Sequence, residues 1–225
     1  FGSDYIALAR AGGIGVLTTV GLLLPIEQRS LVRMLLWIVA ALQLWAVLTA
    51  GARGPALSLA FAFLFFLILS ARNFPYFAVD RFALRLGAVI LIASVALALG
   101  GMQKLFPTLA VRMKLALTEG GSSVLTRLDL YQTATDLWNN SIIFGSGTGQ
   151  FGIAVMGEDV RLYPHNLVLE LGAENGLIGV LIFGALIIVT FAIGLTFLKR
   201  EKGLARVVVR YLLVVCCFTL LNAMV

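Results

Sequence analysis

Six apolar runs dominate this chain, and each approaches or exceeds the length of about 20 residues that a helix needs to cross a bilayer. They cover residues 5–24, 31–50, 54–70, 84–101, 175–198 and 204–225. Because a lipid interior offers no hydrogen-bonding partner to the backbone, apolar runs of this length predict helices. Charged residues make up 12% of the chain, whereas soluble proteins carry about 25%. The sequence therefore predicts an all-α, polytopic membrane helical bundle.

The 225 residues predict one membrane domain over residues 1–225, with no room for a large soluble domain. The chain begins at Phe1 and ends at Val225 within an apolar run, so we expect a fragment of a longer protein. Cys216 and Cys217 are adjacent and cannot form an ordinary mutual disulfide. They therefore indicate nothing about the redox compartment.

The distribution of Lys and Arg predicts the topology. Three connections, residues 27–33, 72–85 and 199–210, hold ten of the seventeen basic residues and are expected to be cytoplasmic. The outer side then receives the turn at Arg53 and a large extracytoplasmic loop, about residues 102–174, that contains short helices. The net charge of +6 follows from this anchoring. Since no basic face carries interleaved aromatic residues, no nucleic-acid partner is expected.

Two features stand out in the predicted outer loop. Residues 126–129 (TRLD) resemble a capping box, and apolar side chains recur after them at helical spacing, so an amphipathic helix is expected to begin there. The stretch FGSGTGQFG, residues 144–152, has four glycines in nine residues and must interrupt any helix. We interpret it as a turn that returns the chain to the membrane. Loops of this length are more often functional than passive.

His165 is the single histidine of the chain, in the segment YPHNLVLELGAENGLIGV at residues 163–180. It is either a capping residue at the start of a helix or a catalytic or ligand-binding group, since imidazole can exchange a proton near neutral pH. No metal site is expected, because there is no second histidine and the cysteines lie beyond another span. A serine hydrolase built on Ser146 lacks the G-x-S-x-G elbow.

Arg53 lies between two spans, on the same predicted side as His165. A structural interpretation is an arginine that extends from a helix end to the membrane surface. A functional one is phosphate binding, because the guanidinium fork suits phosphate and the flanking Gly51 and Gly54 leave room for an anion. The same two interpretations apply to Arg127 on the amphipathic helix.

Polar groups continue along the helix that follows His165. Asn166, Glu170 and Glu174 are spaced four apart and share one face, and carboxylates so close to a span are costly unless they face water or a cavity. Gly176 and Gly179 are interpreted as small residues that allow close helix packing. Neither discontinuous helices nor repeats are evident in the sequence.

Together these motifs form a recognisable order. Gly-Ala-Arg-Gly follows a span; then come Arg127 with Tyr131 and Trp138, the stretch FGSGTGQFG, and Pro-His-Asn followed by nine residues and Gly-Leu-Ile-Gly. Over approximately residues 40–225 this order resembles the O-antigen ligase and O-antigen polymerase superfamily, which includes lipid-A-core ligases, Wzy-type polymerases and pilin O-oligosaccharyltransferases. The His-Asn-x9-Gly-x-x-Gly pattern is its most specific part.

The resemblance implies a GT-C-like fold and a metal-independent, inverting glycosyltransferase without a cofactor. The enzyme would sit in the bacterial inner membrane with its active site on the periplasmic side. It would move a saccharide from a polyprenyl-diphosphate carrier such as undecaprenyl diphosphate to a hydroxyl of a glycan or lipid-A-core acceptor. Ligase, polymerase and protein O-oligosaccharyltransferase share these motifs, so the acceptor stays open.

By position, the resemblance assigns catalytic roles to Arg53, Arg127 and His165. Fixed guanidinium groups would stabilise the negative charge on the leaving diphosphate. His165 would deprotonate the acceptor hydroxyl or bind the diphosphate, and the sequence does not decide between these roles.

Substrate binding is expected from the two arginines with Tyr131, Asn166 and Glu170. Glu170 or Glu174 is an alternative general base. The competing interpretation is a transporter or flippase of lipid-linked saccharides, which would require discontinuous helices or repeats.

Overall fold

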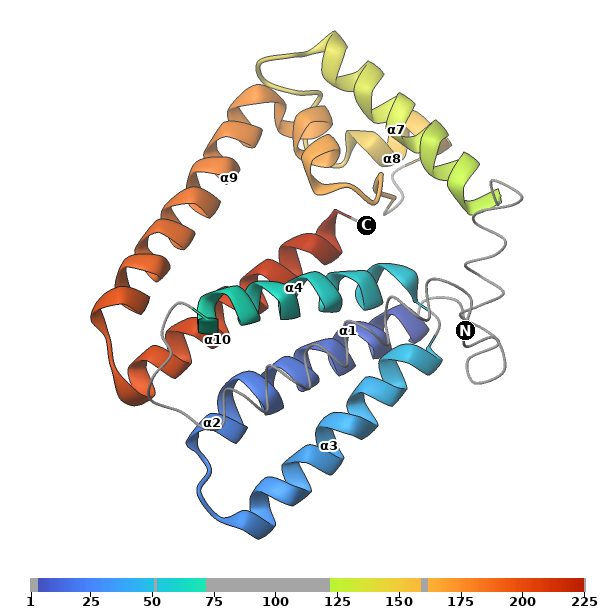
Figure 1. Cartoon of the computed structure of the whole chain (residues 1–225). Coiled ribbons are helices and arrows are strands. Elements are labelled where there is room, and N and C mark those ends of the chain that lie inside the picture. The colour runs from blue at the N-terminus through green and yellow to red at the C-terminus, as the bar shows by residue number, and fades with distance from the viewer. Residues whose placement is uncertain (1–3, 51, 72–121, 159–161, 225) are drawn as a thin grey trace. The chain divides into compact units, whose positions relative to one another are not determined.

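The computed structural model describes residues 4–50, 52–71, 122–158 and 162–224, and its regular elements there are all helices (Figure 1). The N-terminal segment passes through α1 (Asp4–Thr18), a π-helical stretch η1 (Thr19–Leu23) and α2 (Leu24–Ile26). The remaining helices are α3 (Ser30–Thr49), α4 (Arg53–Ala71), α7 (Ser122–Asn140), α8 (Gln150–Met156), α9 (Leu167–Arg200) and α10 (Gly203–Ala223). The predicted all-helical class is confirmed for this part of the chain.

Four described helical segments are long and apolar enough to cross a membrane: Tyr5–Ile26, Ser30–Thr49, Leu167–Arg200 and Gly203–Ala223. Gly54–Ser70 is apolar but shorter. Each of these segments overlaps one of the predicted runs, although Leu167–Arg200 begins before the predicted span 175–198. Together they indicate a membrane protein. The predicted span 84–101 and the first part of the predicted outer loop, residues 102–121, lie outside the described residues.

The described helices fall into two compact units. In the first, α1, α3, α4 and α10 lie side by side, and the last turns of α9 adjoin the start of α10 (Figure 1). Glycines on α1 allow the close approach: a β-carbon on Gly12 would lie 2.8 Å from Cγ2 of Val47 on α3, and one on Gly13 would overlap the ring of Phe218 on α10. Small residues at contacts of this kind let apolar helices approach closely in a membrane.

Side-chain hydrogen bonds also join the helices of the first unit. The hydroxyls of Thr18 and Tyr211 are 2.9 Å apart and link α1 to α10. Thr19 donates to Oε1 of Gln43 on α3 at 3.2 Å. Both threonine hydroxyls also lie within hydrogen-bond distance of a carbonyl one turn back on their own helix, at 2.8 and 2.9 Å, so they join the helices without leaving a polar group unpaired.

Arg210 corrects one boundary drawn from the sequence. The basic stretch 199–210 was expected to be a cytoplasmic connection, although it overlapped the predicted run 204–225. In the structure α9 ends at Arg200 and α10 begins at Gly203, so Arg210 lies inside α10. The side chain is buried, donates from Nη1 to Oγ of Ser70 at 3.0 Å, and lies over the ring of Phe66 at 4.8 Å. Charge density alone did not reveal this, because the partners of Arg210 come from α4.

The second unit contains α7, α8 and α9 up to Ile193. Leu130 and Ala134 of α7, Phe151 of α8 and Ala173 of α9 form its buried core. The predicted amphipathic helix is confirmed as α7, but its predicted start is wrong: α7 begins at Ser122, so Thr126 lies within the helix and does not cap it. The apolar spacing identified the helix correctly, whereas the capping motif misplaced its first turn.

Candidate functional site

A break in α9 organises the second unit. Gly176 has φ 64° and ψ −162°, which are not helical values, although the helical pattern continues on both sides. In an unbroken helix the carbonyls of Ala173 and Glu174 would accept from the amides of Leu177 and Ile178. At the break neither of these two hydrogen bonds forms, because all four groups bond elsewhere. The sequence analysis found no discontinuous helix, so this part of the prediction is wrong.

The connection between α7 and α8 supplies hydrogen-bond partners for the groups that the break leaves unpaired. The amides of Ser146 and Gly147 donate to the carbonyls of Ala173 and Glu174 at 2.8 and 2.9 Å. In return, the amides of Leu177 and Ile178 donate to the carbonyls of Ile142 and Ile143 at 2.8 and 3.3 Å. A broken helix near a membrane is tolerated when its freed backbone groups are satisfied in this way.

Glycine is required on both sides of this contact. Gly145 and Gly176 have φ values of 71° and 64°, in the left-handed region. A β-carbon on Gly145 would overlap the Glu174 carbonyl, and one on Gly176 would overlap the carbonyl of Ile143. A β-carbon on Gly179 would overlap that of Asn175, the residue before the break. The interpretation of Gly176 and Gly179 as helix-packing residues is therefore corrected: both make room for the break.

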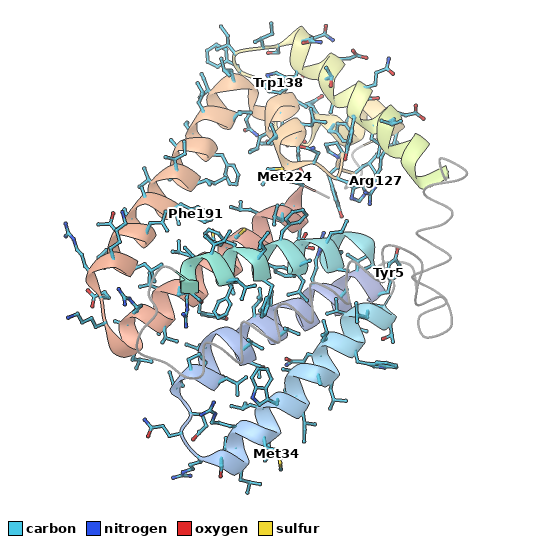
Figure 2. The ribbon with its side chains drawn as sticks, viewed as in Figure 1. Tyr5, Met34, Arg127, Trp138, Phe191 and Met224 are labelled. Atoms are coloured by element: carbon cyan, nitrogen blue, oxygen red, sulfur yellow. The ribbon has the colours of Figure 1, made fainter. Side chains whose placement is uncertain are left out.

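Trp138 adds a side-chain contact to the same junction. Its indole packs against Gly172, where a β-carbon would overlap the ring, and its Nε1 donates to the carbonyl of Ile142 at 3.3 Å. Figure 2 shows Trp138 at the end of α7 that adjoins the connection, with Arg127 toward the other end of the helix. The first part of α9 is therefore attached to α7 by both packing and hydrogen bonds.

His165 lies immediately before the first turn of α9. Its φ is 56°, and among the described residues other than glycine it alone has a positive φ. A left-handed conformation costs such a residue about 1–2 kcal/mol. Its ring packs edge-on against that of Tyr163, with centroids 4.6 Å apart, and Pro164 between them is fully buried. The surrounding structure thus holds the backbone of His165 in an uncommon conformation, and such residues cluster at functional sites.

Asn166 begins α9 by capping it. Its Oδ1 accepts from the amides of Val168 and Leu169 at 3.1 and 3.2 Å. Asparagine is a preferred residue for this role because its side-chain oxygen satisfies amides that have no partner within the helix. The capping function explains Asn166 by itself, while a substrate contact from this residue stays a prediction.

The structure separates the two glutamates proposed as alternative bases. Oε1 of Glu174 accepts from the amide of Gly149 at 2.9 Å, so this carboxylate holds the glycine-rich connection. Glu170 is half-buried one turn earlier on α9, and no hydrogen bond to its carboxylate is found among the described residues. Of the two, Glu170 is the carboxylate that remains available for a substrate.

The remaining predicted site residues lie on different helices. Arg127 and Tyr131 are four apart on α7, in the same unit as His165, and both are half-buried. Arg53 is the first residue of α4 and belongs to the other unit. The convergence of Arg53 with His165 therefore stays a prediction. Ser146, considered as a nucleophile, instead donates its hydroxyl to the carbonyl of Leu137 at 3.4 Å.

Comparison with known proteins gives one family. The family model described as O-antigen ligase matches residues 38–184, more than half of the chain. The chain belongs to the O-antigen ligase family. No curated protein and no solved structure gives a significant match. The match to the family model confirms the family resemblance drawn from the sequence.

Membership places this O-antigen ligase homologue among membrane-bound, glycosyltransferase-like enzymes of lipopolysaccharide and polysaccharide biosynthesis. At this coarse level it implies a lipid-linked glycan donor and a glycan acceptor. The matched region contains Arg53, Arg127 and His165 together with the break at Gly176. The sequence analysis did not name Tyr163 as a site residue. Its position two residues before His165 was the one signal in the sequence for the ring contact that the structure shows.

Gly176→Ala should destabilise the second unit by about 1–3 kcal/mol, because a residue with a β-carbon is strained at this φ and collides with backbone. Gly184→Ala on the same helix is the matched control, since nothing lies within 4 Å of its added β-carbon. Thermal unfolding in detergent would measure both. Equal midpoints for the two variants would contradict a structural requirement for glycine at the break.

Tyr163→Ala should change the environment of the imidazole, whereas Tyr163→Phe should preserve it, because the contact is made by the ring. As the chain has a single histidine, selective isotope labelling gives one imidazole signal to follow by NMR. We expect a ring-current shift in the wild type and Tyr163→Phe that is lost in Tyr163→Ala. Identical spectra for all three would show that the two rings do not touch.

Proposed function

We propose that this O-antigen ligase homologue is a metal-independent, inverting glycosyltransferase that moves a saccharide from a polyprenyl-diphosphate carrier to an acceptor hydroxyl. The observation that carries the proposal is the strained, left-handed His165 held at the start of α9 by Tyr163, Pro164 and the cap at Asn166. A left-handed φ is uncommon for a residue with a β-carbon, although histidine adopts it more often than most. An imidazole held in this conformation at the start of a helix supports a chemical role.

In the proposed reaction, the acceptor oxygen attacks the anomeric carbon while the bond from that carbon to the diphosphate oxygen breaks. The hydroxyl proton passes to a base of the enzyme, and the polyprenyl diphosphate leaves with the bonding electrons. Attack from the face opposite the leaving group inverts the anomeric centre. General base catalysis of such a step contributes about 100- to 10,000-fold.

We assign the base to His165. The amides of Val168 and Leu169 in the first turn of α9 already donate to Asn166, which leaves fewer amides at this helix end for a diphosphate. Because we assign the diphosphate to the two arginines, proton transfer is the role that we propose for His165. We further propose that Glu170, which follows on α9 and is half-buried, contacts the acceptor or the imidazole when substrate is bound.

We assign the diphosphate to Arg53 and Arg127. Guanidinium groups bind phosphate oxygens in pairs and keep their charge at any physiological pH. Positioned against a leaving diphosphate, they would stabilise charge that develops in the transition state, which is usually the largest catalytic contribution. This proposal requires α4 and α7 to present the two side chains to one substrate, at the periplasmic side of the inner membrane.

Transport of lipid-linked saccharides is the second candidate, because the break in α9 is the kind of discontinuous helix that transporters use. In those proteins the unwound backbone binds the substrate or ion. Here the carbonyls of Ala173 and Glu174 and the amides of Leu177 and Ile178 are all bonded to the adjoining connection. The break is therefore better explained as a docking point for the connection than as a transport site.

His165→Gly should lose transfer by about 100-fold or more, because the base is removed, while the unfolding midpoint stays equal or rises, because glycine relieves the left-handed strain. The measurement pairs a transfer assay, with the full protein and a labelled polyprenyl-diphosphate saccharide, with thermal unfolding. His165→Asn is the matched control: asparagine tolerates the left-handed region but cannot act as a base at neutral pH.

Full transfer by either His165 variant at normal expression would refute the assigned role. Movement of labelled lipid across proteoliposomes without product would favour the transporter. Product formation by the wild type, lost in both variants that remain folded, would support the enzyme.

Chelation should leave transfer unchanged, because the proposed charge stabilisation comes from Arg53 and Arg127 without a metal. The same assay would be run in EDTA and after dialysis against it. A loss of activity restored by one specific divalent cation, and not by others, would exclude the metal-independent mechanism.

A further inference from the structure

The second half of α9 marks a membrane boundary. From Leu177 to Leu198 the helix has 22 residues without a charged side chain, and Lys199, Arg200 and Lys202 follow. At 1.5 Å per residue this stretch is about 33 Å long, close to the hydrocarbon thickness of about 30 Å. With the basic residues at one surface, the break at Gly176 and the first apolar residue, Leu177, lie at the other.

The turn after α7 is bonded to this end of the span. The carbonyls of Ile142 and Ile143 accept from Leu177 and Ile178, at donor–acceptor distances of 2.8 and 3.3 Å. Bonds of this length leave no room for the two backbones to lie at different depths. The turn Ile142–Phe144, named here the IIF turn, therefore lies at the membrane boundary together with Leu177.

All three side chains of the IIF turn are exposed and hydrophobic, with exposed fractions of 57%, 56% and 74% from Ile142 to Phe144. The adjoining residues of α9 are also exposed and apolar: Leu177, Ile178, Leu181 and Ile182. The turn thus extends the lipid-facing surface of a span, whereas consecutive large apolar side chains in water would be unfavourable.

Trp138 is an independent indication of the same boundary. Its indole N–H donates to the carbonyl of Ile142, which forms part of the turn. Tryptophan is enriched at the level of lipid headgroups because its ring is apolar and its N–H is polar. Asn139 and Asn140, which precede the turn, are exposed polar residues suited to the aqueous side of that level.

We propose that the IIF turn inserts into the lipid bilayer at the boundary where the apolar part of α9 begins. The partner is the region between headgroups and acyl chains, and Phe144, the most exposed of the three side chains, enters it farthest. Insertion anchors the connection between α7 and α8 to lipid as well as to the break in α9. The glycine-rich residues that follow Phe144 are then held close to the bilayer surface.

The test uses the full protein in nanodiscs, with Cys216→Ala and Cys217→Ala and an environment-sensitive NBD fluorophore on one introduced cysteine. Phe144→Cys is the test site, and Ile143→Cys repeats it in case the first variant does not fold. Thr148→Cys is the matched control, because Thr148 is exposed and polar on the same connection. Leu181→Cys supplies the lipid-exposed reference on α9.

The labels at residues 143 and 144 should be quenched by nitroxides near the carbonyl end of the acyl chains, to an extent similar to the label at 181. They should be protected severalfold from aqueous iodide relative to the label at 148. Equal iodide quenching at 144 and 148 with no nitroxide effect would overturn the proposal. Protection from both quenchers would also overturn it, because it would show that protein covers the turn.

Discussion

The exchange of backbone hydrogen bonds at Gly176 is the constraint on which the second unit depends. Two amides and two carbonyls of α9 that would normally pair with each other pair with the connection between α7 and α8. Each pairing requires the other, because an opened helix without the connection would leave polar groups unsatisfied near the membrane. The result joins α7, α8 and α9 at one point and determines where α9 changes direction.

The candidate site is built outward from this junction. Trp138 and Glu174 attach α7 and the glycine-rich connection to the first part of α9. That part begins with the cap at Asn166 and carries His165 directly before it. A strained residue persists only where its surroundings determine its conformation. For His165 these surroundings are the ring of Tyr163, the buried Pro164 and the cap at Asn166, and the junction attaches the helix that carries them to α7 and α8.

Several features were predictable because they depend on local sequence. Apolar length predicted the helices, since a lipid interior leaves the backbone no alternative to internal hydrogen bonds. The His-Asn-x9-Gly-x-x-Gly pattern predicted the family, and the family match confirms it. The first turn of α9, with His165 and Asn166, also followed from short-range pattern. These signals lie within a few residues of one another.

Other features required tertiary structure because their partners are distant in the chain. The sequence pattern around Gly176 indicated a packing residue. In the structure, residues 142–147 instead form backbone hydrogen bonds with α9 on both sides of the break at Gly176. Arg210 appeared to belong to a basic loop, whereas Ser70 and Phe66 from α4 hold it inside the first unit. The sequence by itself determined the long apolar helices of the described residues and the family to which the motifs belong. Tertiary structure decided where α9 breaks and which buried polar groups are paired, because both depend on hydrogen bonds between segments that are far apart in the sequence.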